Sequence, residues 1–149
     1  MPVITKVEYL SISGVALATP AFWATDLSDL LRPADQRGSD RVIPHGGVFP
    51  KPRRRTVSKR SLPMCFDGHH DADGNFVSNY RLGLDTNLAV VTALCDPVVS
   101  STGTRAATLV LASGNRTADI HVEALDIGDR DGPILMAVLQ ISIPAGQFV

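Results

Sequence analysis

Residue types that bind metal ions gather at one place in this chain, residues 67–75. The segment reads Asp-Gly-His-His-Asp-Ala-Asp-Gly-Asn, so His69 and His70 lie among three aspartates. Imidazole and carboxylate groups together can bind zinc or iron. Adjacent side chains on an extended chain point to opposite faces, however, and the helical spacing of zinc protease histidines (i, i+4) is missing. The segment is dense in turn-forming residues, and we interpret it as a polar loop rather than a metal site.

Other motifs for catalysis or ligand binding are missing from the sequence. A calcium loop that began at Asp71 would need glycine at its sixth position and glutamate at its twelfth, where the chain has Phe76 and Leu82. There is no Gly-x-Ser-x-Gly motif and no phosphate-binding glycine-rich loop between a strand and a helix. Cys65 and Cys95 lie in no motif that would activate a thiol. We therefore expect no catalytic, cofactor-binding or metal-binding residues, and a protein that is not an enzyme.

Length and composition indicate a single soluble domain over residues 1–149. The chain is 44% hydrophobic and 19% charged, which is typical of a folded protein rather than a disordered one. The two cysteines are expected to be buried and reduced. Residues 3–24 are rich in apolar side chains, but Lys6, Glu8 and Pro20 interrupt them. They fit neither a signal peptide nor a membrane span, so we expect synthesis in the cytoplasm and no membrane contact.

Most of the chain shows the pattern of β-strands. Strands are expected at residues 3–12, 15–24, 56–66, 107–112, 118–127 and 134–143. A short helix is expected at 27–31, capped by Asp26 and stopped by Pro33, and a longer helix at about 80–95. The fold class is therefore mainly β (α+β), a β-sandwich or barrel with one packed helix.

Details of the pattern give sharper expectations. Pro63 argues that strand 56–66 lies at a sheet edge. The apolar alternation slips by one residue near Leu125, which indicates a β-bulge. Residues 113–115 are expected to form a hairpin turn. Residues 134–143 are the most apolar run, and we predict a central strand that is buried on both faces in its first half.

Positive charge is concentrated between Arg32 and Arg60. Nine of the fourteen Lys and Arg residues lie there against only Asp35 and Asp40, which gives a net charge of +7. The thirty-one residues before this stretch sum to −2 and the eighty-nine after it to −6. A folding core gains nothing from such separation and self-repulsion opposes it, so the pattern indicates a partner of opposite charge.

Three interpretations of the basic stretch remain open at this point. It is a solvated loop, a site for nucleic-acid phosphates, or a segment that docks on an acidic face of a second copy. Phe49 is the only aromatic residue near the arginines, which is unlike a single-strand binder. For docking, the candidate interface residues are Arg53, Arg54, Arg55, Lys59 and Arg60 on one copy, and Asp119, Glu123, Asp126 and Asp129 on the next.

The order of several short motifs resembles the distal tail protein family, among minor tail proteins of long-tailed actinobacterial phages and prophages. The motifs span nearly the whole chain and are short and structural. They are Ser13-Gly-Val-Ala-Leu17, Phe22-Trp23, Arg37-Gly-Ser-Asp40, Ile43-Pro44, Arg60-Ser-Leu-Pro63, Gly83-Leu84 with Asn87, and Ile143-Pro-Ala-Gly146.

The resemblance implies a tail-tube-like β-sandwich with a packed helix and an extended basic arm, at about residues 41–66. It also implies a virion protein, assembled in the host cytoplasm, that forms a homo-hexameric ring at the distal end of the tail tube. DNA would pass through this ring, and other tail proteins (tube, tip or hub) would bind it. Many family members carry a second, C-terminal domain. We expect a single domain in this chain, so the resemblance does not imply a receptor-binding role here.

Two alternatives to the distal ring are kept. One is a nucleic-acid-binding module that uses the basic segment 51–60. The other is a major tail tube protein, which would polymerise into long tubes rather than stop at a ring. A metal-dependent enzyme that uses His69 and His70 is the most remote possibility.

Overall fold

The computed structural model describes residues 8–34, 36–37, 40–42, 48–50, 54–55, 57–96 and 103–149. For the strands within residues 36–55 it describes the backbone alone. The expected strand at 3–12 therefore falls partly outside the described residues, and Arg53 falls wholly outside them.

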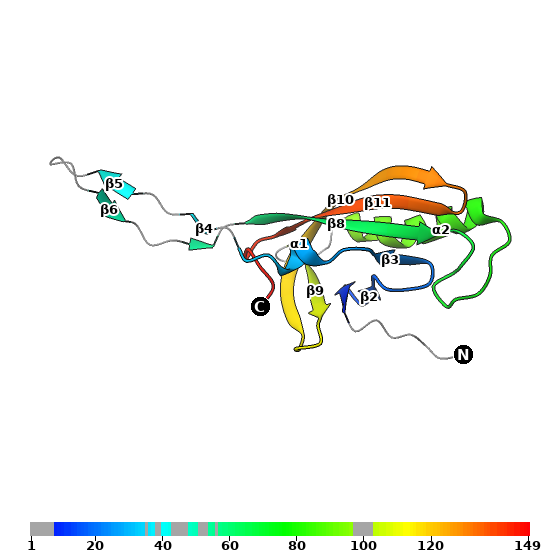
Figure 1. Ribbon diagram of the computed structural model, residues 1–149, viewed down its shortest axis with the longest axis horizontal. Helices are drawn as coiled ribbons and strands as arrows, with labels where there is room; N and C mark the ends of the chain where they lie inside the picture. Colours follow the sequence, from blue (N-terminus) through cyan, green and yellow to red (C-terminus); the bar gives the residue numbers. More distant parts are fainter. Residues whose placement is uncertain are drawn as a thin grey trace.

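Seven antiparallel strands form one sheet in the order β2-β1-β9-β10-β11-β8-β3 (Figure 1). They are β1 (Tyr9–Ile12), β2 (Val15–Ala16), β3 (Phe22–Ala24), β8 (Ser58–Asp67), β9 (Arg105–Val110), β10 (Arg116–Asp131) and β11 (Ile134–Ile143). The helical elements are α1 (Ser28–Leu31), α2 (Tyr80–Thr92) and a 3-10 turn, η1 (Ala93–Cys95). The predicted fold class, mainly β with one packed helix, is confirmed.

Strand β10 joins the two halves of the sheet. Its first residues, Arg116 to Ile120, pair with β9, whereas the remainder, His121 to Asp131, pairs with β11. The expected bulge is present, because the register with β11 shifts twice, between Val122 and Ala124 and again between Ile127 and Arg130. The two halves enclose one core, in which Leu10 and Leu109 belong to the same buried cluster as Leu62 and Leu139.

Helix α2 packs on the core side of the sheet. Its Leu84 and Val91 lie in the same cluster as the inward residues of β8. Asn79 caps the helix, as its side-chain oxygen accepts from the N–H of Leu82. The approach to the chain after β8 is so close that a Cβ atom on Gly83 would lie 1.9 Å from the carbonyl oxygen of Gly68. The predicted helix at 80–95 is confirmed, with a 3-10 last turn.

Four short strands precede β8 and form two antiparallel pairs, which we call the arm strands. They are β4 (Gln36–Arg37) paired with β7 (Arg54–Arg55), and β5 (Asp40–Val42) paired with β6 (Val48–Pro50). Figure 1 shows them beyond the start of β8, leading away from the body. The arm predicted at 41–66 overlaps these strands only in part, because β8 belongs to the main sheet.

The edge position predicted for strand 56–66 is confirmed for residues 58–63 of β8, which pair with β11 alone, and is wrong for the last part of the strand. Strand β8 pairs with β11 over all ten residues and with β3 through Met64, Cys65 and Phe66. The carbonyl of Pro63 accepts from the N–H of Thr25, just past the end of β3. The N–H and C=O of one residue in a strand point to the same side, so Pro63 lacks its N–H on the side where β3 has already ended. Proline is therefore tolerated there.

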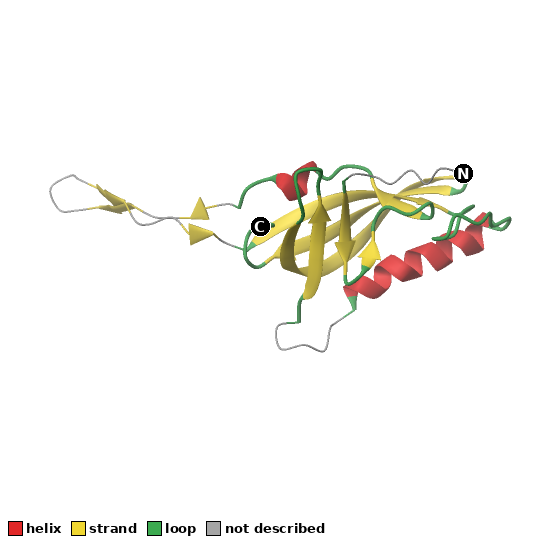
Figure 2. Cartoon of the chain, turned by 90° about the horizontal axis from the view of Figure 1, so that it is seen from below, coloured by secondary structure: helices red, strands yellow, loops and turns green. Residues whose placement is uncertain are grey.

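The prediction that residues 134–143 are buried on both faces in the first half of the strand is also wrong. Strand β11 is central, but its burial alternates, and Met136 is 41% exposed. The outer side of β8 and β11, opposite α2, has no second layer among the described residues (Figure 2). One further expected strand, 15–24, is divided into β2 and β3.

Candidate subunit interface

Arg60 is one of the candidate interface residues, and its side chain is buried in the monomer, with 1% exposed. Its guanidinium donates to the Ser58 hydroxyl (2.8 Å), to the carbonyl of Gly146 (2.9 Å) and to the carbonyls of Asp29 and Pro33. These acceptors come from the start of β8, from α1, from the second residue after α1 and from the C-terminal segment. Arg60 therefore stabilises the fold at the root of the arm, and its buried guanidinium cannot contact a second copy in this conformation.

Other contacts secure the same root. The Asp29 carboxylate accepts from the backbone N–H of Ser61 (2.8 Å) and pairs with Arg32 (3.1 Å). The backbone N–H of Ala34 donates to the side-chain oxygen of Gln147 (2.9 Å). The chain thus leaves the body at Ala34 and returns at β8 between two bonded points. Since α1 replaces a strand beside the first half of β8, it also covers that short stretch of sheet edge.

The remaining basic candidates lie on the arm strands and at the start of β8. Arg54 and Arg55 form β7, and Arg53 falls outside the described residues. Lys59 is exposed on the outer side of β8, across from Ser142 of β11. The cations of the arm and Lys59 stay predictions for contact with a second copy, whereas Arg60 is buried in the single chain.

The acidic candidates are all exposed on β10 but do not form one cluster. They are Asp119, Glu123, Asp126 and Asp129. Glu123 accepts from the Ser142 hydroxyl (2.8 Å) and Asp126 from the Gln140 amide (3.2 Å), so both lie beside β11. Asp119 lies in the half of β10 that pairs with β9, and Asp129 lies within the second register shift. At about 3.3 Å per residue the four spread over roughly 30 Å, which suits an extended partner segment better than a compact one.

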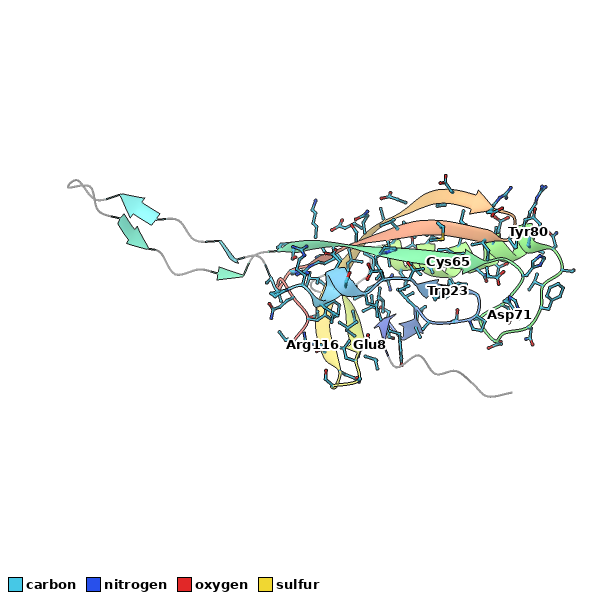
Figure 3. The ribbon with its side chains drawn as sticks, viewed as in Figure 1. Glu8, Trp23, Cys65, Asp71, Tyr80 and Arg116 are labelled. Atoms are coloured by element: carbon cyan, nitrogen blue, oxygen red, sulfur yellow. The ribbon has the colours of Figure 1, made fainter. Side chains whose placement is uncertain are left out.

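Sequence reasoning missed an apolar surface on the outer side of the sheet. Trp23, Cys65 and Met136 pair directly across β3, β8 and β11, and Pro63 pairs with Val138 in the next row. Figure 3 labels Trp23 and Cys65, which lie on neighbouring strands. We call these five residues the outer sheet face. The signal was present in residues 58–67, where both alternating sets contain apolar residues.

The loop with His69 and His70 is held by hydrogen bonds of its own. His69 Nδ1 lies 2.8 Å from the carbonyl of Val77, and His70 Nδ1 lies 2.8 Å from Asp67 Oδ2. The Asp71 carboxylate accepts from the backbone N–H groups of Asp73 and Asn75, and these bonds lower its pKa, that from Asn75 most. Among the described residues, no three His, Cys, Asp or Glu side chains come together as a metal site would require.

A surface hollow of about 440 Å³ brings Cys95 near His121, between η1 and β10. Burial, with a smaller effect from Asp96, raises the pKa of the Cys95 thiol. A nucleophilic cysteine needs the opposite shift, because the thiolate is the reactive form. This pair of residues therefore does not have the character of a catalytic dyad. Neither helix in the described ranges is long and apolar enough to cross a membrane.

Comparison with known proteins gives matches in structure alone. No protein-family model and no curated protein sequence matches the chain. Among solved structures it is similar to the Dit protein (gp 19.1) of phage SPP1, described as a paradigm of the hub adsorption apparatus in phages that infect Gram-positive bacteria. That similarity has a TM-score of 0.58 at 13% identity and covers 95% of this chain but 51% of that one.

Two further matches come from an extracellular contractile injection system, PVC. They are its sheath-tube complex (TM-score 0.49, 10% identity, 95% of this chain and 87% of that one) and its sheath/tube terminator (0.48, 9%, 100% and 96%). At such low identity these matches compare folds alone. The chain has the fold of about half of the SPP1 Dit protein.

Proposed function

We propose that this chain is a structural protein of a phage tail, and that it forms a closed ring at the distal end of the tail tube. The observation that carries the proposal is the fold similarity to the SPP1 Dit protein over 95% of the chain. The short motifs that resemble distal tail proteins support the same class, and they are features of the sequence rather than of the fold. The ring is a homo-hexamer, through which DNA passes.

The arm and β10 supply the first contact between copies in this proposal. A ring interface is heterologous, so each subunit needs two different complementary surfaces. The arm strands lie in the basic stretch and β10 carries the acidic residues, so an arm of one copy laid along β10 of the next brings opposite charges together. Like-charged surfaces repel, which discourages wrong pairings. Other tail proteins bind the ring, and the assembled ring belongs to the virion.

The molar mass of the purified protein, measured by light scattering at low and at high salt, tests this proposal. We expect a ring-sized species that loosens as salt screens the charges, with closed rings in negative-stain images. Long tubes would instead indicate a major tail tube protein. A protein that stays monomeric and shifts random-sequence DNA in a salt-dependent way would support the nucleic-acid-binding alternative and overturn the ring.

Neutralising three arginines of the arm separates charge from fold. The triple substitution of Arg53, Arg54 and Arg55 by Gln should weaken assembly at least tenfold and leave the unfolding midpoint unchanged, since the proposal assigns their charges to the contact between copies. A matched control replaces Arg81, Arg116 and Arg130 of the body by Gln, which changes the net charge equally. Equal assembly of both triple variants would show that the arm charges do not hold the ring together.

A further inference from the structure

Helix α2 presents an uncharged ridge to solvent. Leu82 is 60% exposed and Val90 is 41% exposed, although both are large and apolar. At about 100° per residue, the arc of the helix surface from Ala89 through Leu82 to Val90 carries no charged residue, and Asp85 borders it. We call this surface the α2 ridge, and it consists of Leu82, Thr86, Ala89 and Val90 of α2 and Ala93 at the start of η1.

The one hydroxyl group of this ridge is turned back to the helix itself. The Thr86 hydroxyl donates to the carbonyl of Leu82 (3.0 Å). Its methyl group therefore remains for an outside partner. The charged residues Arg81 and Asp85 lie on one flank, beside the hollow that α2 forms with β10. A surface helix normally carries charge on its solvent side, so a ridge of this kind is typical of a helix that is covered.

The outer sheet face has the same chemistry on the opposite side of the molecule. Met136 is 41% exposed, and Trp23, Pro63 and Val138 are half-buried. Asp126 borders it on β10, across from Val138, and Lys59 lies near the start of β8. Helix α2 packs on the inner side of the same sheet, so the α2 ridge and the outer sheet face point in opposite directions (Figure 2).

We propose that the α2 ridge of one copy packs on the outer sheet face of the next copy. The proposal rests on the proposed function, since it needs self-association, and it names the apolar contact that such an association requires. Both surfaces are uncharged and apolar, so each matches the other better than it matches the basic arm or the acidic residues of β10. Because they lie on opposite sides of one subunit, their contact is heterologous and continues from copy to copy.

The dimensions of the two surfaces agree. Thirteen helical residues span roughly 20 Å at about 1.5 Å each. Ten residues of β8 or β11 span roughly 33 Å at about 3.3 Å each, so the helix fits along the strands. A single helix covers less than the roughly 800 Å² per partner of a stable interface. The arm contact supplies the remaining area, which explains why one subunit carries both features.

Disulfide cross-linking between copies tests the contact directly. In a background with Cys65→Ala and Cys95→Ala, the substitutions Val90→Cys and Met136→Cys are combined in one chain. Bonding within a chain is excluded, because the core lies between these positions and a disulfide allows only about 7 Å between Cα atoms. We expect oxidation to give a ladder of covalent oligomers up to the ring size, and each single variant alone to give monomers. A 1:1 mixture of the two single variants should give a dimer.

The outcomes separate this inference from the proposed function. Rings in negative stain without a ladder would overturn the α2 contact and leave the ring standing. Dimers from Val90→Cys alone would show that helices pack on helices, which also overturns it. A protein that stays monomeric by light scattering would remove the ring and this contact together. As a second measurement, Leu82→Glu with Val90→Glu should reduce assembly at least tenfold, whereas Ala112→Glu with Asn115→Glu on the β9–β10 turn should not.

Discussion

Arg60 should be among the least replaceable side chains outside the apolar core. The substitution Arg60→Met keeps an unbranched apolar stem but removes every N–H donor. The carbonyl of Gly146 then loses its donor within a buried contact, and the carbonyls of Asp29 and Pro33 lose theirs in partly buried ones. Water can reach the last two more easily than the first, so the losses are unequal.

The expected loss of stability can be assembled from these contacts. A buried acceptor without a donor costs about 1–3 kcal/mol, and each partly buried one about 1 kcal/mol after partial hydration. Burying a guanidinium is itself costly, and Arg60→Met removes that cost, which offsets part of the loss. We therefore expect the free energy of unfolding to fall by about 3 kcal/mol. In a domain of this size that corresponds to a fall in Tm of roughly 6–12 °C.

Guanidinium chloride unfolding, followed by circular dichroism, measures this difference. The control is Lys59→Met, which removes a cation from the adjacent, exposed position of the same strand and should change stability by less than about 0.5 kcal/mol. Arg60→Lys keeps the charge but not the planar fork, so its stability should lie between those of wild type and Arg60→Met. If Arg60→Met and Lys59→Met unfold at the same denaturant concentration, the structural role assigned to Arg60 is wrong.

Two other predictions concern the packing and the loop around α2. Gly83→Ala should cost about 3 kcal/mol or more in the same unfolding assay, since its Cβ would meet the Gly68 carbonyl at 1.9 Å. Thr86→Ala on the exposed side of the helix is its control, and equal stabilities would contradict the close approach. Hydrogen bonds, that from the Asn75 N–H foremost, lower the pKa of Asp71, so its stabilising contribution is complete above the pKa of an unfolded aspartate. That contribution is lost as pH falls through the lower folded pKa. An NMR titration measures the pKa of the Asp71 carboxyl, and a midpoint at or above that of an unfolded aspartate would refute this.

The sequence predicted elements whose signals are local. The helix at 80–95 is predicted from the sequence alone, and Asn79 is its cap in the structure. The slip near Leu125 reflects a real register shift, because the alternation of side chains follows the pairing of β10 with β11. In both cases the residues that carry the signal are neighbours in the sequence, so no knowledge of the tertiary fold was needed.

The failures concern features that depend on distant partners. Pro63 indicates an edge, which holds for residues 58–63, but the sequence does not reveal that β3 pairs with the next three residues of β8. Arg60 belongs to a charge run in the sequence, yet its acceptors lie at Asp29, Pro33 and Gly146, as far as 86 residues away. A run of like charges therefore cannot tell which of its members the fold uses. The apolar pairs of the outer sheet face were missed for the same reason, since they span three strands.

The position of Arg60 bears on how the arm works. Both ends of the arm leave the body at points that are bonded to α1 and to the C-terminal segment, so the fold fixes where the arm begins. Different arginines of one basic stretch then contribute to the stability of the monomer and to the affinity between copies. Substitutions at Arg60 should lower the stability of the monomer, and those at Arg53, Arg54 and Arg55 should lower the affinity between copies. Should the arm arginines change the unfolding midpoint as much as Arg60 does, the arm would be part of the monomer's fold, and a different segment would have to hold the ring.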